Sequence, residues 1–499
     1  MSVAAPTPGG VLLAFALFVP VAGLLVAMLA GGRRSEQVAM AVMPLTFAAS
    51  AAAAWRVVAH AAPLEYHLGG WAPPLGIALR ADGLSAIMML MTAVVMVVTA
   101  VYARADFRTA PGAPETRGPF TFWLLLIGLW AAMNAVFLAS DLFTLFVAME
   151  LLTFAAVPMV CLDGRSEQLT AALRYLLFAL LGSVLYLLGA ALLYGVYGTL
   201  DIALLAARMD GAPTALVACS LMTAGLAAKT ALFPLHLWLP PAHAGAPAAA
   251  SAVLSALVVK GSFFITLRLW FDVMPRDVGL SAAQILAALG AAAIIVGSAV
   301  ALRQARLKML IAYSTVAQIG YLFLMFPLAY SAEHGGLTGG AALAGGAMQA
   351  VSHAFAKAGM FMAAGLLYAA LGHDRIADLA GAGRALPMSV IAFALGGISL
   401  VGLPPSGGFV AKWLLLSAAV ESGQWWWALV IAVGGLLAGG YVFGVVMRAL
   451  ALPPVPLVLQ AAIPRRREAA ALALSLVAAL LGMTALLPID VVHIGRGSP

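Results

Sequence analysis

Charged side chains are scarce in this sequence of 499 residues, in which Asp, Glu, Lys and Arg together make up 9% and hydrophobic residues 64%. Soluble globular domains carry about 25% charged residues, so the composition excludes that class. The mean hydropathy of +1.05 agrees with this exclusion. The sequence is therefore typical of a chain that crosses a lipid bilayer many times.

Cysteine is almost missing as well. Cys161 and Cys219 are the only two, with no CxxC pair and none of the spacings that hold an iron–sulfur cluster or a c-type haem. No glycine-rich phosphate loop follows a strand pattern. We therefore expect this chain to bind no cofactor and no metal, and any electron transfer would take place in another subunit.

Apolar runs of about 20 residues recur along nearly the whole sequence, and each is long enough to cross a bilayer as a helix. They predict an all-α polytopic membrane protein with about fourteen transmembrane helices. The runs cover residues 11–30, 38–59, 83–103, 120–138, 141–162, 170–196, 214–238, 247–272, 281–302, 307–330, 341–371, 387–421, 424–449 and 469–488. The twelfth run reads as one interrupted helix.

The arginines follow membrane topology, and the net charge of +7 therefore does not indicate a nucleic-acid partner. Alternate connections between the runs hold most of them: Arg33, Arg34, Arg104, Arg108, Arg117, Arg165, Arg174, Arg303, Arg306, Arg375, Arg384 and Arg465 to Arg467. The intervening connections hold mainly Arg80, Arg208 and Arg276. Positively charged loops stay in the cytoplasm, so we expect a bacterial plasma (inner) membrane protein with arginine-rich cytoplasmic loops and both termini outside.

Lysine is distributed in the opposite way. Only five lysines occur; Lys308 stands at the start of a run, and the others lie inside long apolar runs: Lys229, Lys260, Lys357 and Lys412. Each lysine in hydrocarbon costs roughly 2.5–3.5 kcal/mol on insertion scales. A buried lysine, unlike arginine, can release its proton. This pattern favours a membrane protein that moves protons.

Two of the predicted helices are interrupted by proline. In the seventh, Lys229 is followed by Pro234, His236, Pro240, Pro241 and His243; in the twelfth, Pro404 and Pro405 precede Lys412. Proline removes a backbone donor, so the freed carbonyls need partners at membrane depth. Such prolines can simply kink a helix. Two breaks five helices apart, each beside a buried lysine, favour an ion pathway between inverted repeats.

The breaks predict a domain organisation of two inverted five-helix repeats. Helices 1–3 would occupy residues 1–119, the first repeat (helices 4–8) residues 120–272 and the second (helices 9–13) residues 281–449. A loop and helix 14 would follow in residues 450–499.

Several motifs resemble those of the antiporter-like membrane subunits of respiratory complex I, membrane-bound hydrogenases and Mrp-type sodium/proton antiporters. The motifs are Phe233 to Pro247 (FPLHLWLPPAHAGAP), Asp141 to Leu151 (DLFTLFVAMEL), Lys308 to Ser314 (KMLIAYS), Ser352 to Ala358 (SHAFAKA) and Gly402 to Lys412 (GLPPSGGFVAK). They stand in the family's order, and the resemblance covers roughly residues 69–449. Residues 69–85 look closest to the D-type subunit of the antiporters. Pro241 departs from the family, which commonly has an acid there.

The resemblance implies a proton relay through the membrane midplane. In the family, the glutamate matching Glu150 pairs with the lysine matching Lys229, which can soften the cost of burying both charges. Lys260 would be the central relay, His353 and Lys357 would follow it on one helix face, and Lys412 would be terminal. The support at the helix breaks would come from Pro234, His236, Pro240, His243, Pro404 and Pro405.

Simpler roles remain open for individual residues. His236 and His243 could have no role beyond hydrogen bonds to exposed backbone, and Lys260 could simply donate to a helix-end carbonyl. Lys357 or Lys412 could extend to the membrane surface.

Three functional hypotheses follow. The first is a proton-translocating subunit that works with other membrane subunits, carries protons with or without Na⁺, and has no catalytic chemistry of its own. Its complex would be an antiporter, an NADH:quinone oxidoreductase-like pump or a hydrogenase. The alternatives are an autonomous secondary transporter of a small solute and a membrane enzyme with catalytic residues in its loops.

Overall fold

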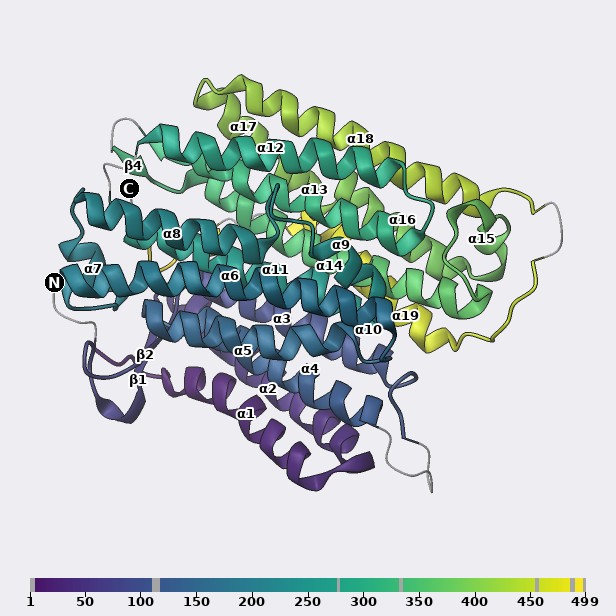
Figure 1. Cartoon of the computed structure of the whole chain (residues 1–499), viewed down its shortest axis with the longest axis horizontal. Helices are drawn as coiled ribbons and strands as arrows, with labels where there is room; N and C mark the ends of the chain where they lie inside the picture. The colour runs from purple at the N-terminus through teal and green to yellow at the C-terminus, as the bar shows by residue number, and fades with distance from the viewer. Residues whose placement is uncertain are drawn as a thin grey trace.

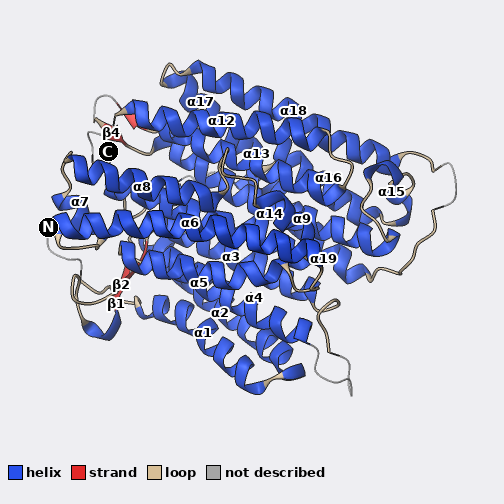
Figure 2. Cartoon of the chain, in the orientation of Figure 1, coloured by secondary structure: helices blue, strands red, loops and turns tan. Residues whose placement is uncertain are grey.

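Long helices lying side by side form most of the molecule, and two short β-hairpins lie at one end of the bundle (Figures 1 and 2). The computed structural model describes residues 5–109, 117–275, 279–331, 335–453, 457–484 and 490–496. Arg276, assigned above to a connection, lies outside the described residues.

The elements of the N-terminal half run in the order α1 (Val11–Ala30), α2 (Gly32–His60), β1 (Leu64–His67), η1 (Leu68–Gly70), β2 (Ala78–Ala81), α3 (Gly83–Ala103), α4 (Arg117–Leu138), α5 (Leu142–Val160), α6 (Ser166–Tyr197), α7 (Ile202–Arg208), α8 (Pro213–Thr230), α9 (Leu239–Gly245), α10 (Ala248–Val253), the π-helical turn η2 (Leu254–Val258), α11 (Val259–Arg268) and the π-helical turn η3 (Leu269–Val273).

The remaining elements are α12 (Leu280–Leu302), α13 (Leu307–Leu328), β3 (Tyr330–Ser331), β4 (Gly336–Leu337), α14 (Gly340–Leu371), η4 (Ile376–Asp378), α15 (Ala382–Ala385), α16 (Pro387–Val401), α17 (Gly407–Glu421), α18 (Trp425–Leu450), α19 (Arg465–Leu480) and η5 (Leu481–Thr484).

The predicted fold class, an all-α polytopic membrane protein, is confirmed. Within the described residues, twelve helices are long and apolar enough to span a bilayer, and they match twelve of the fourteen predicted runs. The other two runs are the interrupted ones, which the structure splits into α8 and α9 and into α16 and α17. For the last run, α19 and η5 are described as far as Thr484, and residues 485–489 lie outside the described part.

Aspartates begin three helices at the hairpin end of the bundle. Asp82, Asp141 and Asp201 are the N-caps of α3, α5 and α7, and each side chain accepts a hydrogen bond from a backbone N–H three residues on. Antiparallel bridges join Leu79 to Ala139 and Asp141 to Asp201, so residues next to the caps extend the β1–β2 hairpin. The hairpin end is therefore tied together by backbone hydrogen bonds outside the spans.

Glycine lets two helix pairs pack at backbone contact. A Cβ on Gly225 of α8 would lie 2.3 Å from the Gly182 carbonyl of α6, and one on Gly320 of α13 would lie 2.2 Å from the Gly290 carbonyl of α12. Small residues drive helix association in membranes because they allow this close approach. The first contact lies one turn from Lys229, so it also fixes where that lysine stands.

Candidate functional site

Glu150 and Lys229 form an ion pair between α5 and α8. Lys229 Nζ lies 2.7 Å from Glu150 Oε1 and donates to Thr153 Oγ1 at 3.0 Å. The Ser183 hydroxyl of α6 also donates to Glu150. The side chains of Lys229 and Glu150 are 6% and 23% exposed, respectively. The structure thus brings together the two residues that the resemblance pairs, and it adds two hydroxyl groups around them.

At the helix break beyond Lys229, the Ala227 and Ala228 carbonyls are hydrogen-bonded. α8 ends at Thr230, Ala231 has a left-handed backbone (φ 58°), and the Leu232 N–H bonds to the Ala227 carbonyl. The Trp238 indole N–H donates to the Ala228 carbonyl at 3.0 Å. Lys229 lies in the last turn of α8, where the helix dipole favours a cation.

The two histidines of this break are buried, but their Nδ1 atoms bond no backbone. The His236 ring stacks on Phe233, with 5.4 Å between centroids, and His243 packs edge-on against Trp238 and Phe361. Neither Nδ1 has a hydrogen-bond partner within the described part of the chain. Trp238, a residue outside the predicted site, bonds the exposed backbone instead.

Lys260 lies in the middle of the bundle and is fully buried. Its Nζ donates to the Ser255 carbonyl at 2.7 Å, inside the π-helical turn η2. π-Helical turns shift the register of backbone bonding and frequently mark functional sites. The Ser255 hydroxyl bonds Thr315 Oγ1 on α13 at 2.9 Å. Lys260 therefore contacts a carbonyl of its own helix.

His353 and Lys357 lie one turn apart on α14, and both are buried. Lys357 Nζ donates to Ser314 Oγ at 2.5 Å and to the Ile311 carbonyl at 3.0 Å, both on α13. Lys357 therefore points into the bundle, away from the membrane surface. Neither ring nitrogen of His353 has a partner among the described residues.

Lys412 reaches back across the second break. Its Nζ donates to the Leu400 and Val401 carbonyls, at 2.6 and 2.9 Å, at the C-terminus of α16. The Tyr321 ring lies 4.5 Å from the same nitrogen. Ser406 lies in the break and caps α17. The break thus presents two helix-end carbonyls to a buried lysine.

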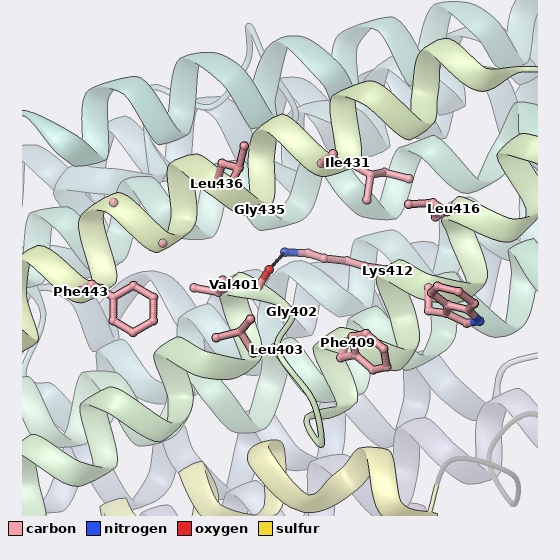
Figure 3. Close-up of a pocket in the computed structure, with 14 residues that line it drawn as sticks. Val401, Gly402, Leu403, Phe409, Lys412, Leu416, Ile431, Gly435, Leu436 and Phe443 are labelled. Carbon is pink, nitrogen blue, oxygen red and sulfur yellow. Dashed lines mark hydrogen bonds between the residues drawn. The ribbon is translucent and has the colours of Figure 1, made fainter.

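A cavity of about 670 Å³ adjoins Lys412, between α17 and α18 (Figure 3). Its lining is otherwise apolar and includes Leu403, Leu436 and Phe443, whose side chains are partly exposed on the outer surface of the bundle. Lys412 therefore lies between the protein interior and a cavity that opens sideways.

Lys308 and Arg268 are among the buried charged residues that the sequence-based prediction of the site missed. Lys308 is 7% exposed and donates to the Ala246 carbonyl, just beyond α9. Arg268 of α11 is also buried and pairs with Asp82 at 2.6 Å and Asp272 at 3.0 Å. Arg268 stands inside the predicted run 247–272, and this placement was the available signal. For Lys308, its position at a run start argued against burial.

The Arg268 cluster borders a cavity of about 900 Å³ at the hairpin end of the bundle. Burial alone would raise the pKa of Asp82, but Arg268 and Arg496 outweigh burial and hold that pKa well below its ordinary value. Burial also raises the pKa of Glu65, with Arg80 offsetting it only in part. In the described residues, no cluster of His, Cys, Asp or Glu could hold a metal ion.

Comparison with known proteins gives consistent matches over most of the chain. A family model described as NADH:quinone oxidoreductase/Mrp antiporter, TM, matches residues 139–438. NADH-quinone oxidoreductase subunit N of Desulforudis audaxviator is 34% identical over 393 residues, which are 78% of this chain and 75% of that protein. The D subunit of the Na⁺/H⁺ antiporter of Alkalihalophilus pseudofirmus is 30% identical over 373 residues, which are 74% of this chain and 72% of that one.

A solved structure matches nearly the whole fold. A chain of the Mrp complex from Dietzia sp. DQ12-45-1b superposes with a TM-score of 0.86 at 25% identity, covering 98% of this chain and 97% of that chain. The residues from Glu150 to Lys412 all lie within the matched family region.

Proposed function

The chain belongs to the NADH:quinone oxidoreductase/Mrp antiporter transmembrane family, and on that premise we propose that it moves protons as one subunit of a multisubunit membrane complex. The relatives named above are subunits of such complexes. The complex that recruits this chain, antiporter or redox-driven pump, supplies the driving force. The chain itself supplies the path.

The observation that carries the proposal is the Glu150–Lys229 pair beside a broken helix. A buried pair of opposite charges is stable only while both charges are present. A proton that arrives nearby breaks that balance and frees Lys229 to exchange its own proton. The pair is thus a switch at one end of a row of titratable residues, which continues through Lys260, His353 and Lys357 to Lys412.

Three further lysines continue the row through the bundle. Lys260, Lys357 and Lys412 donate to carbonyl or hydroxyl oxygens, and none of them has an ion-pair partner within the described residues. A lysine with neutral partners can exist with or without its proton, because no fixed negative charge requires the ammonium form. Protons move from Lys260 past His353 to Lys357 and on to Lys412.

The helices that carry the row form the two predicted repeats. Residues 120–272 hold Glu150, Lys229 and Lys260, and residues 281–449 hold His353, Lys357 and Lys412. Each repeat contributes one broken helix, and each break lies beside a lysine. Pro234 and Pro240 interrupt the first helix and Pro404 and Pro405 the second, and His236 and His243 support the first break only by packing against aromatic rings.

The arginine-rich end of the bundle faces the cytoplasm. Arginine-bearing connections meet there. An antiparallel backbone bridge joins Arg306 to Arg375, and the side chains of Arg104 and Arg467 form ion pairs with Glu36 at 2.8 Å and with Asp106 at 2.5 Å. The hairpin end, where the Arg80 side chain bonds the Gly495 carbonyl, faces outward. This orientation follows the preference of positive loops for the cytoplasmic side. The membrane is the plasma membrane.

The decisive experiment keeps the charge of Lys260 and removes its ability to exchange a proton. The complex carrying Lys260→Arg, reconstituted in liposomes, should assemble normally and lose at least about tenfold in proton transfer, since guanidinium holds its proton at any working pH. The matched control is Arg34→Lys, the reverse exchange at an exposed position. Full activity of Lys260→Arg would leave Lys260 a structural role and overturn the relay. Antiport by the chain alone would favour the autonomous transporter.

A further inference from the structure

A stretch of polar side chains without charge lies between Lys357 and Lys412. On α13, Ser314, Gln318 and Tyr321 are spaced four and three residues apart, which places them on one helix face. All three are buried. Lys357 lies at one end of this face, where it donates to Ser314, and Lys412 lies at the other, against the Tyr321 ring.

Gln318 joins this face to the second helix break. Its Nε2 donates to the Leu400 carbonyl at 3.2 Å, and that same carbonyl accepts from Lys412 at 2.6 Å. Its Oε1 accepts from Gln349 Nε2 of α14 at 2.8 Å, one turn before His353. Both ends of the Gln318 amide are thus held, and the side chain has one fixed orientation. An amide held in this way positions its neighbours but does not itself pass protons.

Tyr441 of α18 completes the cluster. Its side chain is 2% exposed, and its hydroxyl interacts with the Gln318 and Ser314 side chains. Neither contact reaches the distance and angle of a full hydrogen bond, so the hydroxyl has no such partner among the described residues. Buried polar groups are nearly always bonded, and an exception calls for an explanation. Here the unbonded group is the Tyr441 hydroxyl, which lies between Lys357 and Lys412 of the proposed path.

We propose that the Tyr441 hydroxyl, which lies beside Gln318, carries protons between Lys357, through Ser314, and Lys412. This step rests on the proposed function. The Lys357 ammonium gives a proton to the hydroxyl chain and becomes an amine. The Ser314 and Tyr441 hydroxyls each accept one proton and release another. A water molecule accepts the proton that Tyr441 releases and gives one to the Lys412 amine, which becomes an ammonium, so the protons balance and nothing is consumed.

A packing role for Tyr441 predicts a different outcome. Because its hydroxyl makes no full hydrogen bond, Tyr441→Phe keeps the ring and removes little stabilising contact. If the residue served only to fill space between α13 and α18, the substitution would leave transport unchanged. Tyr441→Phe therefore separates conduction from packing without unfolding the site.

The test measures proton transfer by the intact reconstituted complex with Tyr441→Phe. Transfer should fall at least tenfold with normal assembly and thermal stability, and the rate ratio between H₂O and D₂O should change. Tyr368→Phe, a tyrosine 38% exposed on α14, is the matched control and should behave as wild type. Gln318→Leu should lower transfer and shift its pH profile, whereas Gln318→Glu, which keeps the acceptor, should recover part of it.

Lys260→Ala, assayed in parallel, distinguishes a failure of the Tyr441 proposal from a failure of the proposed function. Wild-type transfer by Tyr441→Phe together with inactive Lys260→Ala would overturn the role of Tyr441 and leave the proposed function in place. Wild-type transfer by both variants would overturn the proposed function itself.

Discussion

Asn134 supplies the hydrogen bond that Pro20 denies to its own helix. Pro20 lies inside α1 and has no N–H to donate to the Ala16 carbonyl one turn before it. Asn134 Nδ2 of α4 donates to that carbonyl at 2.7 Å. The proline and the asparagine are 114 positions apart, yet together they satisfy one carbonyl and dock α1 on α4.

This relationship predicts a rescue. Asn134→Leu should destabilise the protein by about 1–3 kcal/mol, because it leaves a buried carbonyl unpaired. Pro20→Ala restores the missing N–H, so the double variant should regain most of that loss. Thermal unfolding of the purified complex measures all three variants. Equal stability of the single and double variants would mean that the Ala16 carbonyl is satisfied in another way.

Removing one member of the buried ion pair should stop transport. Lys229→Ala leaves Glu150 without its cation, so no ion pair remains that an arriving proton could open. We expect transfer to fall at least about tenfold while the complex still assembles. Glu421→Gln, a change at an exposed glutamate, is the control. Normal pumping by Lys229→Ala in proteoliposomes would contradict the assignment of the pair.

Lys412 gives a test in which two substitutions differ in a defined way. Lys412→Ala should block transfer and leave the Leu400 and Val401 carbonyls without this donor. Lys412→Glu should be less stable than Lys412→Ala, since its carboxylate would face two carbonyl oxygens and the negative end of α16. Unfolding temperatures and transfer rates of the two variants decide this. The reverse order of stability, or normal transfer by Lys412→Ala, would count against the contacts described.

Glu65 should make stability depend on pH at the hairpin end. Because burial raises its pKa above the ordinary value of 4.5, the folded protein holds this proton more tightly than the unfolded chain. The resulting stabilisation is full below pH 4.5 and is lost as the pH rises through the folded pKa. As the pH rises from 4.5 through the folded pKa, the unfolding temperature of the wild-type protein should therefore fall relative to that of Glu65→Gln. Glu421→Gln should show no such divergence, and parallel curves for all three proteins would exclude the effect.

The length and order of the spans, and the two breaks, could be predicted from the sequence because each depends on neighbouring residues. Run length sets the spans, and proline sets the breaks. The partners of the charges could not be predicted in this way. Lys308 bonds the Ala246 carbonyl 62 positions away, and Arg268 pairs with Asp82 across 186 positions. Such contacts depend on how helices distant in sequence are arranged.

The positions of the relay candidates along their helices have an electrical consequence under the proposed function. Glu150, Lys260 and Lys357 stand near the middle of their spans, Lys229 stands in the last turn of α8, and Lys412 stands in the second turn of α17, after the break. A charge that crosses a membrane potential exchanges about 2.3 kcal/mol per 100 mV. A charge that moves sideways at constant depth exchanges none. Under the proposed function we therefore expect voltage to act on the steps by which protons enter and leave, and to act little on a sideways transfer from lysine to lysine.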